Sequence, residues 1–203
     1  MAKKPSLKFL LKTIGEIMKN LFTFTCLLAL SSCSVTQLND KIKSVSHMYS
    51  EEVRNLDPRV YRRSFAFSKT ESFERAQSAV SELGFTITEV DKNKLIVEGI
   101  ATGPTPFTKD EWIELGKIEK PKIKEVGGWM MTWPSDPSSG YDTMIIELIA
   151  TTRELKDGSE VELKWKIDTP KYAEIGIDPI KKPPASAVTK GCKKFWAAFN
   201  REN

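Results

Sequence analysis

Histidine and cysteine are scarce in this chain of 203 residues, which contains one histidine and three cysteines. Catalytic triads, Cys-His dyads and the usual zinc sites need these residue types in groups. The histidine, His47, lies among polar residues and is interpreted as a solvated side chain. The chain also lacks a Gly-rich loop of the kind that binds phosphate. These absences argue against most histidine-, thiol- and metal-based enzymes.

Long apolar runs are lacking as well. The most apolar segment, Leu21 to Leu30 (LFTFTCLLAL), is about half as long as a helix that spans a bilayer. The residues before it are rich in positive charge, with Lys3, Lys4, Lys8, Lys12 and Lys19. A cationic start, a short apolar segment and small residues after it are typical of a secretory signal. We therefore expect the apolar segment to be removed rather than retained in the membrane.

The four residues that close this segment, Leu30-Ser31-Ser32-Cys33, resemble the lipobox of bacterial lipoprotein precursors. The resemblance implies cleavage between Ser32 and Cys33, a diacylglycerol on the Cys33 thiol and acylation of the new amino group. Ser34 stands where an aspartate would signal retention in the inner membrane, which favours the outer membrane, facing the periplasm. Translation could begin at Met1 or at Met18, since Met18 would start a more compact signal.

Charge of one sign is not in excess once the signal is removed. Residues 1–32 contain five of the 31 Lys and Arg residues and one of the 27 Asp and Glu residues, so 26 of each sign remain. A neutral mature chain has no basic stripe for binding nucleic acid. Cys26 leaves with the signal and Cys33 is the anchor, so Cys192 remains the free thiol and no intramolecular disulfide can form. Stability must come from a packed core.

Residues 33–58 are expected to form a lipid-anchored tether. The segment is polar, but its apolar residues recur at the period of one helix face: Leu38, Ile42, Val45, Tyr49, Val53 and Leu56. Leu56-Asp57-Pro58 would stop such a helix. The tether should become helical when this stripe finds a surface, which could belong to the domain itself or to a partner.

Residues 59–203 are expected to form a single α+β domain. Residues 59–67 alternate like a strand. Ser68 and Glu71 have capping-box spacing and predict a helix that ends at Gly84. Residues 85–90 and 95–101 are then predicted to form a β-hairpin.

The pattern is interrupted at residues 102–140. Thr108 and Glu111 repeat the capping-box spacing and predict a short helix that carries Trp112. A long Lys-, Pro- and Gly-rich stretch follows, and long loops in compact domains are often functional. Two tryptophans and two methionines gather in it, a composition typical of adaptable contact surfaces. The candidate binding loop therefore consists of Trp112, Trp129, Met130, Met131 and Trp133. These side chains could equally fold back as a lid over the sheet.

The last third of the domain predicts a second hairpin and a closing helix. Asp157-Gly158 lies between the β-rich segments 141–155 and 159–168 and is a strong hairpin signal. In the second segment, apolar and charged residues alternate, which predicts a sheet covered on one face only. After Pro183-Pro184, apolar residues recur at helical spacing, including Cys192, which is more often a core residue than a reactive thiol.

The expected fold is thus α+β, with an antiparallel sheet of about five strands covered on one face by helices, in the order β-α-β-β-(α)-β-β-α. This order of elements resembles the helix-grip domains of BamC-type lipoproteins. The resemblance is one of topology, and topology alone does not assign a function.

Two hypotheses about function remain open. The first is a non-catalytic envelope lipoprotein that binds another protein, with membrane contact through lipidated Cys33 and no cofactor, metal or nucleic acid. The second is a carrier that encloses a lipid or other apolar ligand between the sheet and the C-terminal helix. Carboxylate-based hydrolysis is disfavoured, because Asp110, Glu111 and Glu114 lie in the first turns of a helix, where acidic residues ordinarily interact with its dipole.

Overall fold

The protein is an α+β fold built on a five-stranded antiparallel sheet with the strand order β1-β5-β4-β3-β2. The computed structural model describes residues 36–128, 144–169 and 180–201. The strands are β1 (Arg62–Phe65), β2 (Thr86–Asp91), β3 (Ile96–Thr102), β4 (Ile145–Leu155) and β5 (Gly158–Asp168). The helices are α2 (Pro58–Tyr61), α3 (Lys69–Glu82), α4 (Lys109–Gly127) and α6 (Ala185–Phe199), and residues 36–54 are also helical.

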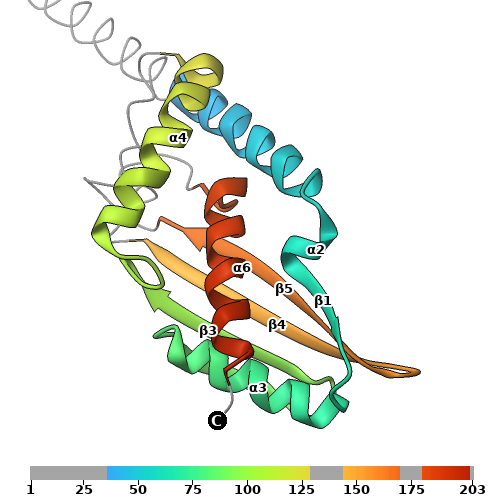
Figure 1. Ribbon diagram of the computed structural model, residues 1–203. Helices are drawn as coiled ribbons and strands as arrows, with labels where there is room; N and C mark the ends of the chain where they lie inside the picture. The colour runs from blue at the N-terminus through green and yellow to red at the C-terminus, as the bar shows by residue number, and fades with distance from the viewer. Residues whose placement is uncertain (1–35, 129–143, 170–179, 202–203) are drawn as a thin grey trace, which may run out of the picture.

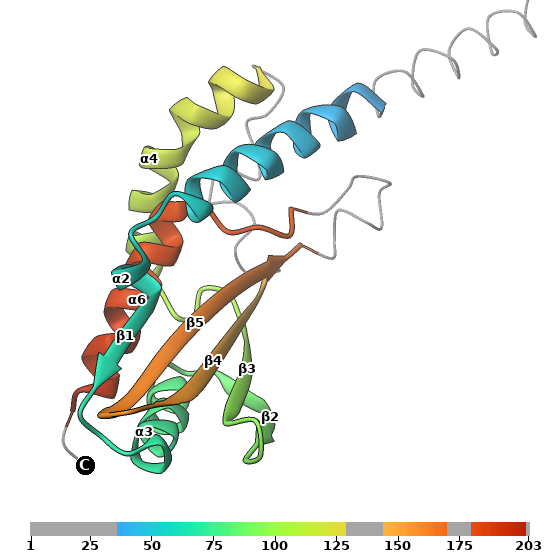
Figure 2. The same cartoon turned by 90° about the vertical axis from the view of Figure 1, so that its right-hand side faces the viewer.

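Helices α3 and α6 lie on the same face of the sheet, and α4 runs beside α6 and beyond the end of the sheet (Figure 1). Seen from the side, the opposite face of the sheet carries none of the described helices (Figure 2). The expected class, an antiparallel sheet of about five strands covered on one face by helices, is therefore confirmed.

The residues of β5 show how the sheet presents two different faces. Val161, Leu163 and Trp165 are buried beneath the helices, whereas Glu160, Glu162 and Lys164 between them point to the open face. Side chains alternate in this way because successive Cβ atoms of a strand point to opposite sides. The alternation predicted from the sequence is thus realised with its apolar side toward the core.

The helix of residues 36–54, called the N-terminal helix below, packs against the rest of the domain. Ile42, Val45 and Tyr49 are buried, and they form a small cluster with Ile123 of α4 and with Ile180. The Lys41 ammonium group also donates to the carbonyl oxygen of Gly127 at 2.8 Å, at the end of α4. The apolar stripe therefore finds its surface on the domain.

The segment after this helix differs from the expected long strand. Asp57 caps a short helix, since its side chain accepts from the Arg59 amide, and Pro58 occupies the first turn. Strand β1 begins only at Arg62. Asp-Pro therefore stops one helix and starts another, because an N-cap aspartate followed by proline suits a helix start. The strand predicted for residues 59–67 was too long at both ends.

Helix α4 is longer than predicted. The capping box is complete, because the Glu111 amide donates to the Thr108 hydroxyl and the Thr108 amide donates to the Glu111 carboxylate. The helix then continues through Pro121 to Gly127. A proline inside a helix costs about 3 kcal/mol, and burial of Ile123 against the N-terminal helix offsets that cost. Part of the Lys-, Pro- and Gly-rich stretch expected to be a loop is therefore helical.

The remaining elements agree with their sequence signals. Ser68 caps α3 by accepting from the Glu71 amide, and Gly84 follows the helix with a φ of 84°. A two-residue turn joins β4 to β5, with Leu155 opposite Gly158. In α6 the side chains of Val188, Cys192, Phe195 and Phe199 are all buried. These signals are local, so neighbouring residues are sufficient to define them.

Candidate functional site

The structure places Trp112 in the core of the domain. The side chain is 5% exposed, its indole N–H donates to the Pro104 carbonyl at 2.6 Å, and its ring meets Phe107 edge to face at 5.0 Å. Trp112 therefore offers no surface to a partner, which corrects its assignment to the candidate binding loop. Trp129, Met130, Met131 and Trp133 lie outside the described residues, as do Ser32 and Cys33.

The free thiol of Cys192 is also a core group. Its residue is fully buried, and the Trp165 indole N–H points at the sulfur from 3.3 Å. Burial raises the pKa of the thiol to about 12, so the sulfur stays protonated at neutral pH. The prediction of a core cysteine is confirmed. Within the described ranges, no three His, Cys, Asp or Glu side chains are grouped closely enough to hold a metal ion.

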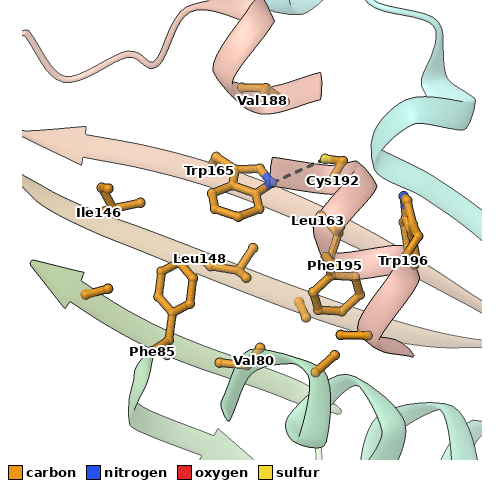
Figure 3. Close-up of a cluster of buried hydrophobic side chains, with 14 of the residues drawn as sticks. Val80, Phe85, Ile146, Leu148, Leu163, Trp165, Val188, Cys192, Phe195 and Trp196 are labelled. Atoms are coloured by element: carbon orange, nitrogen blue, oxygen red, sulfur yellow. Dashed lines mark hydrogen bonds between the residues drawn. The ribbon is translucent and has the colours of Figure 1, made fainter. Parts of the chain in front are cut away.

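Aromatic rings fill the space between α6 and the sheet (Figure 3). Phe65 of β1 lies 4.5 Å from Phe199 between ring centroids, and Phe195 meets Trp196 edge to face at 5.0 Å. On the sheet side, Trp165 meets Phe85 at 5.9 Å. Ring pairs at such distances are in direct contact. Most of these side chains are buried, and Phe65 is partly buried against them.

The closest approach between α6 and the sheet is at Gly191. A Cβ atom added there would lie 2.8 Å from Cζ2 of the Trp165 ring, closer than real Cβ contacts. A similar contact exists at Gly99 of β3, where an added Cβ would lie 2.8 Å from a methyl group of Val80 on α3. Glycine at both points allows each helix to sit directly on the sheet.

One edge of the sheet is covered by a strand along only part of its length. Strand β1 pairs with β5 from Phe65 opposite Ser159 to Arg62 opposite Glu162. Beyond Arg62 the chain turns back into helix α2, so residues 163–168 of β5 have no strand partner among the described residues on that side. Unpaired sheet edges present free backbone donors and acceptors and can pair with another chain.

The register of the β4–β5 hairpin tells which backbone groups point to this free edge. Residues that flank a two-residue turn form a hydrogen-bonded pair, which here is Leu155 and Gly158. Because bonding alternates along an antiparallel ladder, the N–H and C=O groups of Leu163, Trp165 and Ile167 point away from β4. None of them bonds to another backbone group among the described residues on that side. The edge is therefore chemically competent to accept a strand.

A groove of about 530 Å³ lies along this edge. It is called the edge groove below, and it has β5 on one side and the N-terminal helix, α2 and the start of α6 on the other. Its lining residues are Tyr49, Ser50, Val53, Arg54, Tyr61, Glu162, Leu163, Lys164, Trp165, Lys182, Pro183 and Val188.

The walls of the edge groove combine uncharged rings with positive charge. Burial raises the pKa of Tyr49, and the nearby carboxylates Glu119 and Glu52 raise it further, so the phenol stays neutral. Glu162 is paired with Arg62 at 3.0 Å. Lys164 and Lys182 are exposed and have no ion-pair partner among the described residues. The unpaired charge of the groove is therefore positive.

A second groove, between α4 and α6, is less suited to binding. Four of its charged side chains already pair across it, since Lys194 contacts Glu111 at 2.6 Å and Lys190 contacts Glu114 at 2.9 Å. These bridges join the two helices and leave little charge unpaired. These ion pairs hold α4 and α6 together.

The edge groove was not predicted from the sequence. The signal that could have found it is Asp57-Pro58, because a helix start at this point shortens β1 and exposes part of β5. The walls of the groove come from segments that are far apart in the chain, and no local pattern predicts their meeting.

Comparison with protein-family models, with curated proteins and with solved structures found no significant match. In the part of the chain that the structure describes, no helix has both the length and the apolar character needed to cross a bilayer.

Proposed function

We propose that the mature chain is a non-catalytic lipoprotein of the bacterial envelope that binds another protein. Lipidated Cys33 anchors it in the outer membrane, and the α+β domain faces the periplasm. The resemblance of Leu30-Ser31-Ser32-Cys33 to a lipobox supports the anchor. The neutral charge of the mature chain gives no reason to expect nucleic acid as the partner.

The observation that carries the choice of a binding module is the direct contact of α6 with the sheet. Gly191 leaves no room for even one methyl group above Trp165, and aromatic rings occupy the space around it. A carrier of a lipid or other apolar ligand would need a cavity at this point, since ligand sites enclose most of the surface of their ligand. The packing therefore favours a protein that acts through its surface.

The experiment that tests this function is a native mass spectrum of the mature protein released from its own membranes in mild detergent. We expect the mass of Cys33 to Asn203 with acyl groups, together with the mass of a second protein. A small extra mass that is lost on unfolding would favour the carrier instead. A chain without acyl groups would overturn the envelope address.

The same experiment on the variant Lys182→Glu tests whether the second protein binds at the edge groove. This residue lines the edge groove and is exposed, so its replacement should leave the fold intact. If the second protein binds at the edge groove, the variant should retain its acyl groups and lose most of the complex. Unchanged complex formation would place the binding surface elsewhere on the domain.

A further inference from the structure

The free edge of β5 offers a row of backbone groups with a defined direction. Leu163, Trp165 and Ile167 point their N–H and C=O groups toward the edge groove, as the hairpin register requires. The side chains of the same residues are turned to the covered face of the sheet. A ligand that satisfies this row must itself have alternating donors and acceptors at strand spacing, which is the property of an extended peptide.

The open face beside this edge carries a positive charge that has no ion-pair partner within residues 36–128, 144–169 and 180–201. Lys164 points to the open face, and its neighbour on β4 is Ile149, which cannot pair with it. Two residues earlier, Glu162 has Arg62 of β1 directly opposite, at 3.0 Å. Opposite charges at facing positions stabilise strand pairs. By the same rule, a strand that continues the position of β1 would place an acidic residue opposite Lys164.

The covered side of the edge groove favours apolar side chains. Val53 and Tyr61 are partly buried there, and Val188 of α6 is buried. A strand beside β5 turns alternate side chains toward these residues and the others toward the open face. The groove therefore suits a segment in which apolar and acidic residues alternate.

We propose that the edge groove binds an extended segment of a partner protein as an added strand beside residues 163–167 of β5, with an acidic residue of that segment opposite Lys164. This inference rests on the proposed function, because it specifies how the partner is held. The segment continues the sheet where β1 ends, and its apolar side chains contact Tyr61 and Val53.

The test uses the mature lipidated chain in mild detergent and a short blocked peptide in which Val and Asp alternate. Hydrogen exchange is measured by mass spectrometry with and without this peptide. We expect slower exchange for the amides of Leu163, Trp165 and Ile167, because a strand partner protects the amides that face it. Protection of β2, which forms the other edge of the sheet, or no protection at any strand, would overturn the proposal.

A matched peptide separates strand addition from mere adhesion. It carries the same side chains, but the amides that would face β5 are N-methylated and cannot donate. Binding should fall at least ten-fold, whereas methylation of the opposite amides should leave it within two-fold. Equal affinity for both methylated peptides would overturn the added strand.

A charge exchange tests the register. Lys164→Glu should weaken binding of the Val-Asp peptide by roughly two- to five-fold, the size expected for a facing charge pair, and should strengthen binding of a Val-Lys peptide. Lys156→Glu, an exposed change at the hairpin turn, is the control and should alter neither affinity. Equal responses of both variants would contradict the position assigned to Lys164.

These outcomes can be distinguished from failure of the proposed function. If the native mass spectrum contains a second protein but the peptide does not protect β5, the protein binds a partner in another way and only the added strand is wrong. If the spectrum contains a dimer of this chain that the peptide does not displace, a second copy occupies the edge and the proposal is wrong.

Discussion

Gly191 on α6 lies against the indole ring of Trp165 on β5, and a Cβ atom at this position would come within 2.8 Å of Cζ2 and 2.9 Å of Cη2. The neighbouring residue on the helix, Cys192, receives the indole N–H of the same ring at 3.3 Å. The Trp165 ring is thus held against α6 in two ways: Gly191 has no side chain to push it away, and the indole N–H donates to Cys192 (Figure 3). This contact determines how closely the helix covers the sheet.

The first prediction follows from this close approach. Gly191→Val should lower the free energy of unfolding by about 1–3 kcal/mol, because a larger side chain forces the helix or the ring to move. Urea unfolding measures the loss. Ala197→Val is the control, since residue 197 is exposed on the same helix and carries the same β-branched side chain. Equal losses in the two variants would mean that contact with Trp165 is not the cause.

The second prediction concerns the reactivity of Cys192. Burial raises the pKa of its thiol to about 12, and the residue is fully buried. The attacking species in thiol chemistry is the thiolate, so a thiol reagent at pH 8 should fail to label the folded chain and should label it fully in urea. Cys192→Ala gives the background. Labelling of the folded protein at the unfolded rate would show that the helix does not seal this site.

The third prediction concerns Glu111, which joins the start of α4 to Lys194 of α6 at 2.6 Å. Burial raises the pKa of its carboxyl, but hydrogen bonds from Lys194 and from the Thr108 amide lower it more, so the net shift is downward. Because folding lowers the pKa of Glu111, its negative charge stabilises the fold at pH values above 4.5, the ordinary pKa of the carboxyl group. This contribution is lost as the pH falls through the pKa of the folded state.

Glu111→Gln tests this charge. Glutamine can keep the capping-box geometry, so the variant removes the charge and leaves the cap. We expect it to be less stable than the natural chain by about 1 kcal/mol at pH 7, with the difference shrinking as the pH falls through the lowered pKa of Glu111. Glu114→Gln is the control, since the exposed ion pair of Glu114 with Lys190 should contribute little to stability. A difference that persists at low pH would contradict an ionic origin.

The fourth prediction concerns the membrane anchor. Cys33→Ala should abolish lipidation and release the chain from the membrane fraction, because the anchor is expected on this thiol. Cys26→Ala changes a cysteine inside the apolar segment and should leave attachment unchanged. Fractionation with metabolic labelling by a fatty acid measures both. A Cys33→Ala chain bound to membranes at the natural level would rule out the anchor.

Several elements could be predicted because their causes are local. Ser68 and Thr108 cap helices with side chains that reach amides three residues away. Asp157-Gly158 closes a hairpin, because such pairs adopt the backbone conformation that a tight turn needs. The buried face of α6 follows from the spacing of its apolar residues. Each of these features depends on a few neighbouring residues.

Other features depend on residues that are distant in the chain. Helix α4 was expected to be short, yet it continues through Pro121, and Ile123 packs against the N-terminal helix. Trp112 looked available for binding, but Pro104 and Phe107 enclose it. In both cases the deciding contacts are made by residues in other parts of the fold, so only the packed structure reveals them.

The sequence by itself determined the α+β class, the order of the strands and of the longer helices along the chain, the hairpin turns and the apolar faces, since periodicity and turn chemistry are properties of short segments. Only the tertiary structure decided where β1 ends against β5, and therefore that the backbone groups of Leu163, Trp165 and Ile167 have no strand partner among the described residues beside a basic groove. The reason is physical: the edge groove is formed by segments that meet when long-range packing brings the N-terminal helix, α2 and the start of α6 to one edge of the sheet.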